Sequence, residues 1–167
     1  MIKRTIHKNI APWIEREEII FLNGPRQVGK TTLMKQFQKE LEAKGKQTFF
    51  FNLENPNDLS LTEDYEYFRR SILPKKGKVI VFLDEIQRHS KPSNFLKWLY
   101  DEHKLRIKLF VSGSANLDIK AKLQDSLVGR KRSFLLEPFN FTEFLEAKEF
   151  RTGKNPISDE KQLKILT

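Results

Sequence analysis

The sequence contains no cysteine, only three histidines and no long run of apolar residues. The lack of cysteine excludes a disulfide framework, a thiolate metal site and a cysteine nucleophile, and it makes a cytoplasmic location the default expectation. The histidines lack the spacing of metal ligands, so we interpret them as ordinary core or surface residues. No apolar run approaches the length that crosses a membrane, and the basic N-terminus lacks the apolar stretch of a signal peptide. The composition therefore predicts a soluble globular protein.

Positive charge, in contrast, is in excess. The chain has 31 lysines and arginines against 22 aspartates and glutamates, which gives a formal net charge of +9. Such a surface attracts polyanions, and nucleic acid is the obvious candidate. Because the lysines are scattered along the whole chain, a merely solvated basic surface explains the charge equally well. The charge alone leaves both interpretations open.

The strongest local motif occupies residues 24–31, which read Gly-Pro-Arg-Gln-Val-Gly-Lys-Thr and fit the pattern G-x-x-x-x-G-K-[ST] without a mismatch. Glycines let backbone N–H groups turn inward around an anion, and a following helix adds its positive dipole end. The apolar run 19–22 before the motif is typical of a buried strand, and the apolar spacing in 32–41 predicts a helix. This context favours a phosphate-binding loop over a chance glycine-rich turn.

The loop and the residue that follows it supply the candidate phosphate-binding residues, which are Gly24, Pro25, Arg26, Gln27, Val28, Gly29, Lys30, Thr31 and Thr32. The Lys30 ammonium can reach the outer phosphates, and the Thr31 hydroxyl can ligate Mg²⁺.

Strands and helices alternate along the rest of the chain. Further strands are expected at 47–53, 79–85, 108–112 and 133–136, further helices at 62–73, 93–103, 117–127 and 141–150, and a turn at 55–58. This alternation predicts an α/β fold with a doubly wound, mostly parallel five-stranded sheet and helices on both faces. Residues 1–17 are expected to be a helical lead-in, 18–150 the core, and 151–167 a linker and the start of a further region.

Two acidic residues end the third expected strand. Asp84 follows the apolar run 79–83, as in the Walker B pattern, in which the carboxylate holds Mg²⁺ through its waters. Glu85 can orient and deprotonate a water molecule for attack on a γ-phosphate. The structural alternative is that both acids merely mark the end of a strand.

Two further residues are candidates for catalysis. Ser112 ends the fourth expected strand, where its hydroxyl could contact a γ-phosphate or the attacking water; the alternative is a plain turn. Arg130 could supply positive charge to the transition state, in the same chain or across a subunit boundary. A solvated basic turn or a nucleic-acid contact explains Arg130 equally well.

These motifs together resemble the prokaryotic AAA-family ATP-binding proteins. The resemblance rests on residues 24–33, on Leu83-Asp84-Glu85-Ile86-Gln87, on 111–114, and on 127–130 with 136–139, and it spans residues 19–146. In that family an AAA-type ATPase domain usually precedes a C-terminal domain of unknown function with a restriction-endonuclease-like fold. The resemblance implies a P-loop NTPase fold with the additional-strand, AAA-like strand order, and it implies a lid and a C-terminal domain beyond Thr167.

The resemblance also implies ligands and roles. ATP and Mg²⁺ are the expected ligands, with Lys30 and Thr31 as their contacts, Asp84 as the Mg²⁺ ligand and Glu85 as the catalytic base. Ser112 or Ser114 stands at the sensor position, and Arg130 is expected to matter in a less defined way. The leading hypothesis is Mg²⁺-dependent ATP hydrolysis that drives or switches an attached C-terminal domain or partner, with assembly into a homo-oligomer as a further expectation. The alternatives are a slow nucleotide switch and an ATP-controlled nucleic-acid-binding module.

Overall fold

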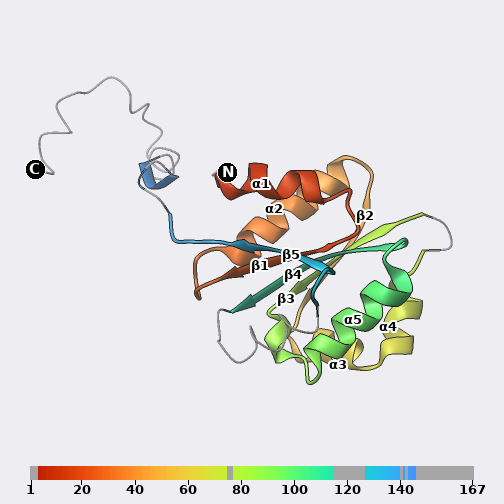
Figure 1. Ribbon diagram of the computed structural model, residues 1–167. Coiled ribbons are helices and arrows are strands. Elements are labelled where there is room, and N and C mark those ends of the chain that lie inside the picture. Colours follow the sequence, from red (N-terminus) through yellow and green to blue (C-terminus); the bar gives the residue numbers. More distant parts are fainter. Residues whose placement is uncertain (1–3, 75–76, 115–126, 140, 142, 146–167) are drawn as a thin grey trace, which may run out of the picture.

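A five-stranded parallel sheet forms the centre of the protein (Figure 1). The computed structural model describes residues 4–74, 77–114, 127–139, 141 and 143–145. The strands lie in the order β2-β3-β4-β1-β5, and every neighbouring pair is parallel. Their bounds are β1 Ile19–Gly24, β2 Gln47–Asn52, β3 Val79–Asp84, β4 Ile107–Ser114 and β5 Lys131–Leu135. The predicted doubly wound α/β fold is confirmed, with a sheet that is entirely rather than mostly parallel.

Helices cover both faces of this sheet (Figure 1). On one face lie α1 Ile6–Ile10, the short 3-10 helix η1 Ala11–Trp13, and α2 Lys30–Ala43; on the other lie α3 Pro56–Glu63, α4 Tyr65–Ile72 and α5 Pro92–His103. A second 3-10 turn, η2 Ile86–Arg88, follows β3 directly. Among the described residues, no helix combines the length and apolar character of a membrane span.

Alternate residues of each strand face two separate hydrophobic cores. In β1, Ile20 and Leu22 pack toward α2, whereas Ile19 and Phe21 pack toward α4 and α5. The apolar face predicted for α2 is buried in the core between this helix and the sheet, and it consists of Leu33, Phe37 and Leu41. Since both faces of the sheet are covered, β3 is buried along its whole length, including Asp84.

Two predicted elements differ from the structure. The single helix expected at 62–73 is two helices, because the Asp64 side chain accepts a hydrogen bond from the Tyr67 N–H (2.9 Å) and so caps a new start. The turn expected at 55–58 is the start of α3, where the Asn55 side chain caps the helix ahead of Pro56 at the first helical position. The helix expected at 117–127 lies outside the described residues except for Leu127, which is in a turn. The region 151–167 and most of the helix expected at 141–150 also lie outside the described residues.

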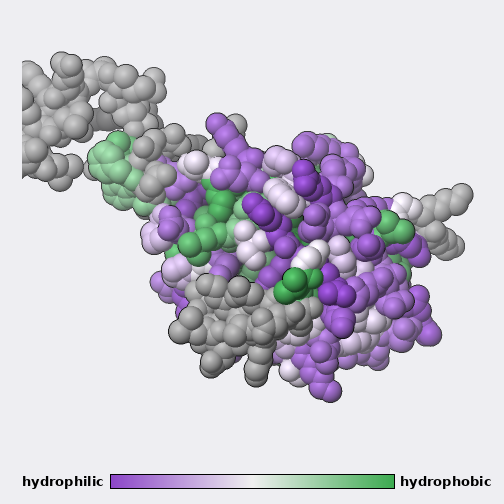
Figure 2. Space-filling view, viewed as in Figure 1, coloured by the Kyte–Doolittle hydropathy of each residue, from purple (hydrophilic) through white to green (hydrophobic). Residues whose placement is uncertain are grey.

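The segment after β5 is unusually apolar for a surface. Four large hydrophobic side chains there are exposed, namely Phe139, Phe141, Phe144 and Leu145. Figure 2 shows hydrophobic surface at this end of the molecule, while hydrophilic residues cover most of the rest of the same view.

Candidate nucleotide-binding site

The phosphate loop joins β1 to α2 at the carboxyl edge of the sheet. Gly24 passes so close to the neighbouring segment that a Cβ atom there would lie 2.3 Å from the Leu136 carbonyl oxygen. Gly29 has a φ of 94° and lies immediately before α2, and Gln27 also has a positive φ, of 63°. Left-handed residues of this kind curl the backbone so that successive N–H groups can face an anion at the start of a helix.

Lys30 lies inside this loop. Its side chain is almost fully buried, with 4% of the residue exposed. The Nζ atom donates to the carbonyl oxygens of Gly24 (3.1 Å) and Pro25 (2.8 Å), so the ammonium group lies against the loop that the motif defines. A buried positive charge at the start of a helix, beside a loop with left-handed residues, is suited to an anionic ligand.

Asp84 connects three elements at the same edge. Its Oδ2 accepts a hydrogen bond from the Thr31 hydroxyl at the start of α2 (2.6 Å), and its Oδ1 accepts one from the Ser112 hydroxyl on β4. The register explains the second contact, because Leu83 lies opposite Val111 and the next residues, Asp84 and Ser112, therefore lie side by side. The structure thus brings together Thr31, Asp84 and Ser112, which are far apart in the sequence.

Glu85 lies next to this group in a strained backbone conformation, with a φ of 58°. Its N–H donates to the Ser112 hydroxyl oxygen (3.0 Å), and one of its carboxylate oxygens accepts a hydrogen bond from the Gln87 amide. Left-handed non-glycine residues are uncommon and tend to occur at functional sites. Gln87 received no role from the sequence, although it ends the Asp-Glu-Ile-Gln box that carries the resemblance.

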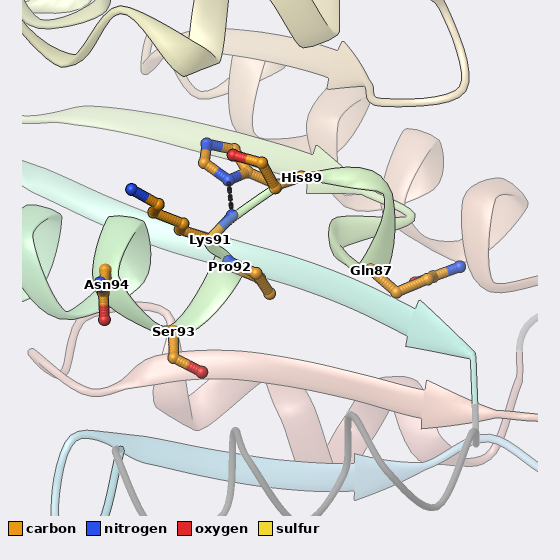
Figure 3. A pocket seen from close by; sticks show the side chains of 7 residues that line it. Gln87, His89, Lys91, Pro92, Ser93 and Asn94 are labelled. Atoms are coloured by element: carbon orange, nitrogen blue, oxygen red, sulfur yellow. Dashed lines mark hydrogen bonds between the residues drawn. The ribbon is translucent and has the colours of Figure 1, made fainter.

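A pocket of about 340 Å³ opens beside this turn, lined by Gln87, His89, Ser90, Lys91, Pro92, Ser93 and Asn94. In Figure 3 the Gln87 side chain points away from His89 and Lys91. The His89 Nδ1 accepts a hydrogen bond from the Lys91 N–H (3.0 Å), and its Nε2 faces the Thr62 carbonyl at 3.3 Å. Burial lowers the pKa of His89, so the ring is a neutral core residue that joins this turn to α3.

Arg130 lies at the opposite edge of the sheet. It directly precedes β5, and its carbonyl oxygen accepts a hydrogen bond from the N–H of Ile19 at the start of β1 (2.8 Å). Its guanidinium forms an ion pair with Asp101 on α5 (2.7 Å). The phosphate loop begins where β1 ends, so the structure does not bring Arg130 to the nucleotide site of its own chain. Of the two catalytic roles considered for Arg130, only a contact with the site of a neighbouring subunit stays a prediction.

Arg4 is a second residue that the sequence did not indicate. Its buried guanidinium donates to the carbonyl oxygen of Val28, inside the phosphate-loop motif, at 3.0 Å. Arg4 belongs to no motif and precedes the loop by a helix and a strand, so no local pattern reveals the contact.

Comparison with known families decides the identity of this fold. A family model described as an AAA domain matches residues 16–145, most of the chain. The chain belongs to this AAA domain family. It is thus an AAA-type nucleotide-binding module, and the expected prokaryotic AAA-type ATPase domain is confirmed at the level of family and fold.

Relatives of this AAA domain are longer proteins. An uncharacterized protein of Mycobacterium tuberculosis is 30% identical over 118 residues, which cover 70% of this chain and 24% of the relative. An uncharacterized protein of Methanocaldococcus jannaschii is 27% identical over 161 residues, or 95% of this chain and 35% of the relative. The chain therefore spans about a quarter to a third of the length of these curated relatives.

A solved structure supports the fold assignment. The ORC1 protein of Aeropyrum pernix, determined in complex with DNA, superposes with a TM-score of 0.61 at 16% sequence identity. The match covers 96% of this chain and 51% of that one. At this identity the likeness concerns the fold alone.

Proposed function

We propose that the chain binds ATP together with Mg²⁺ and hydrolyses the γ-phosphate bond. The observation that carries the proposal is the hydrogen-bonded set of Thr31, Asp84 and Ser112 beside the phosphate loop, with Glu85 directly adjacent. Residues 24–32 would surround the phosphates with backbone N–H groups, and the Lys30 ammonium would exchange its carbonyl partners for phosphate oxygens.

The oxygen atoms of Thr31 and Asp84 fit a magnesium site. A hydroxyl and a carboxylate oxygen from two different elements lie 2.6 Å apart, and such hard oxygen donors are the ligands that Mg²⁺ prefers. Bound Mg²⁺ would supply positive charge against the negative charge of the phosphates. The Ser112 hydroxyl fixes the orientation of the Asp84 carboxylate from the other side.

Glu85 is the proposed general base. Its backbone is fixed by Ser112, and its carboxylate is held by the Gln87 amide, so the side chain is oriented before any water is bound. Proton abstraction by a positioned carboxylate contributes roughly a hundredfold or more to such reactions.

The test is a steady-state phosphate-release assay on wild type and Glu85→Gln. We expect turnover to fall by about a hundredfold or more, while ATP affinity stays close to that of wild type, because the amide keeps the shape but cannot accept the proton. Glu54→Gln is the matched control, since Glu54 is an exposed carboxylate at the same edge that pairs with Arg88. Equal phosphate-release rates for wild type and Glu85→Gln would remove the catalytic role.

ATP binding and hydrolysis are proposed to drive or switch the region that is attached to this domain in the longer protein. The curated relatives are about three to four times longer than the matched part, and exposed phenylalanines gather where the chain leaves β5. An exposed apolar group of this kind is typical of a surface that another domain covers. A homo-oligomer, with Arg130 reaching a neighbouring subunit's site, belongs to the same proposal.

A basic cluster favours nucleic acid as a second candidate ligand. The guanidinium groups of Arg16 and Arg132 lie over the ring of Trp13, at 4.5 and 4.8 Å from its centroid. Both arginines are exposed, and among the described residues neither pairs with a carboxylate, whereas nearby Glu15 and Glu17 pair with lysines. Fixed, unpaired guanidinium groups are suited to backbone phosphates.

A salt series tests this second candidate. Binding to duplex DNA should weaken as salt rises, and replacing Arg16 and Arg132 by alanine should reduce the steepness of the log–log salt plot by about two. Arg69→Ala is the control, because that arginine is partly exposed and paired with Glu66. Binding that is insensitive to salt would argue against a phosphate-contacting surface.

A further inference from the structure

Arg4 joins three segments that are distant in the sequence. Its Nη1 donates to the Val28 carbonyl in the phosphate loop (3.0 Å), and its Nη2 donates to the Glu137 carbonyl just after β5 (2.6 Å). Its Nε lies 3.2 Å from Oε2 of Glu143, and its guanidinium lies 4.5 Å from the centroid of the Phe139 ring. The arginine is 8% exposed and Glu143 5%. The Nε atom forms no hydrogen bond among the described residues, so two hydrogen bonds, the ion pair and the aromatic ring together hold the guanidinium in place.

The contact with Val28 has a consequence for the loop. The Val28 carbonyl and the Gly29 N–H belong to one peptide unit, and no cis peptide bond occurs among the described residues. In a planar trans unit these two groups point in opposite directions. A donor that holds the Val28 carbonyl therefore makes the Gly29 N–H point away from Arg4. Gly29 cannot fix this orientation itself, because glycine occupies both signs of φ readily.

The other end of Arg4 is attached to the exit from the sheet. Glu143 binds Arg4 through one carboxylate oxygen and accepts the Thr5 N–H on the other (2.7 Å), so two consecutive N-terminal residues hold it. The Leu136 carbonyl, next to Glu137, is also the atom that packs against Gly24 at the other end of the loop. Both ends of the phosphate loop are thus braced by the same short segment after β5.

We propose that Arg4 is a positioning residue that fixes the Gly29 N–H and links the phosphate loop to Glu137 and Glu143. The proposal rests on the proposed function in that the ligand of the loop is the phosphate chain of ATP. Movement of the segment after β5 then changes phosphate affinity through Arg4. By thermodynamic reciprocity, phosphate binding in turn stabilises the segment after β5 in the arrangement in which it contacts Arg4.

The experiment combines hydrogen exchange and ATP binding on the full chain. Arg4→Lys keeps the charge but replaces the planar fork by a point charge, which cannot hold both carbonyls and the Glu143 carboxylate in the same geometry. We expect amide exchange within residues 22–33, measured without nucleotide, to become about tenfold faster, while exchange within β3 stays at the wild-type rate. ATP affinity should fall by about tenfold, the effect of losing one hydrogen bond to a charged group. Arg69→Lys is the matched control, and we expect neither quantity to change in it.

The alternatives give different results. Faster exchange to the same extent in the loop and in β3 would mean that Arg4 only stabilises the whole fold, and it would overturn the proposal. Unchanged exchange in the loop would overturn it as well. If Arg4→Lys does not fold, Glu143→Gln takes its place, with faster exchange confined to the loop expected and an unchanged loop contradicting the proposal. Failure of the wild type to bind ATP would count against the proposed function, whereas loop exchange would still decide the role of Arg4.

Discussion

Two buried lysines at opposite edges of the sheet make the most instructive comparison in this protein. Lys30, at the carboxyl edge, donates to the carbonyl oxygens of Gly24 and Pro25. Lys108, near the amino edge, donates in the same way to the carbonyl oxygens of Arg16 and Glu18, and it is even less exposed, at 1% against 4%. Burial and hydrogen bonding to the backbone therefore do not distinguish a ligand site from a structural contact.

The surroundings of the two lysines do differ. Lys30 lies in a loop with left-handed residues at positions 27 and 29, at the start of a helix and close to the Thr31–Asp84–Ser112 set. Lys108 holds the irregular segment that leads into β1, and burial lowers its pKa to about 8. The surroundings of Lys30 can accept an anion, whereas Lys108 stabilises a turn of the backbone.

The largest expected effect comes from Lys30→Met. Removing the ammonium from the phosphate loop should weaken ATP binding by about a hundredfold or more, since an interaction of a charged group with several phosphate oxygens is lost. Titration with a fluorescent ATP analogue measures this. Retained affinity in Lys30→Met would contradict the assignment of the loop.

Lys108→Met is the matched substitution at the other edge, and its effect should be on stability. It leaves the carbonyl groups of Arg16 and Glu18 without their donor, which should lower the free energy of unfolding by about 1–3 kcal/mol. Urea denaturation measures the change, and ATP affinity should stay at the wild-type value. A loss of ATP affinity as large as that of Lys30→Met would erase the contrast between the two edges.

The pH dependence of stability should sharpen the same comparison. Because the folded-state pKa of Lys108 is about 8 and its ordinary value is 10.5, the unfolded chain binds the proton more tightly than the folded one. The stability of the wild type should therefore rise relative to that of Lys108→Met as pH increases from about 8 toward 10.5. Parallel pH profiles for the two proteins would show that the Lys108 pKa is not lowered.

Arg130→Ala should give the smallest effect. Its exposed ion pair with Asp101 is screened by solvent, so we expect only a slight fall in Tm. ATP affinity of the isolated chain should not change, because Arg130 lies at the edge away from the loop. A large loss of affinity at protein concentrations where the chain is monomeric would show that the amino edge reaches the site.

Local patterns were enough to predict how the phosphate loop and Asp84 are arranged. The strand before Gly24, the helix after Gly29 and the acid at the end of β3 each follow from contiguous residues and from the rule that parallel strands end at one edge. The same rule places Arg130 at the amino edge, away from the phosphate loop, since the residue directly precedes β5. The apolar spacing in 62–73 continues across Asp64, so it does not reveal that this residue caps a new helix.

Contacts between irregular segments could not be predicted. Arg4 contacts Val28 and Glu137 through side-chain to backbone hydrogen bonds. Because every residue has a backbone carbonyl, such an acceptor cannot be recognised from the residue type. The Gln87 contact with Glu85 depends on the left-handed backbone of Glu85, which a non-glycine residue rarely adopts.

The position of β1 within the sheet determines when this site can exist. Among the described strands β1 comes first in the sequence, yet both of its partners, β4 and β5, follow much later in the chain. Pairing at such sequence separations is slow, because a long loop must close before any contact is gained. The Leu136 carbonyl also lies against Gly24 of the phosphate loop, and Leu136 follows β5 in the chain. A nascent chain that ends before β4 and β5 therefore contains the complete motif, but its β1 still lacks both of the strands that hold it in the sheet.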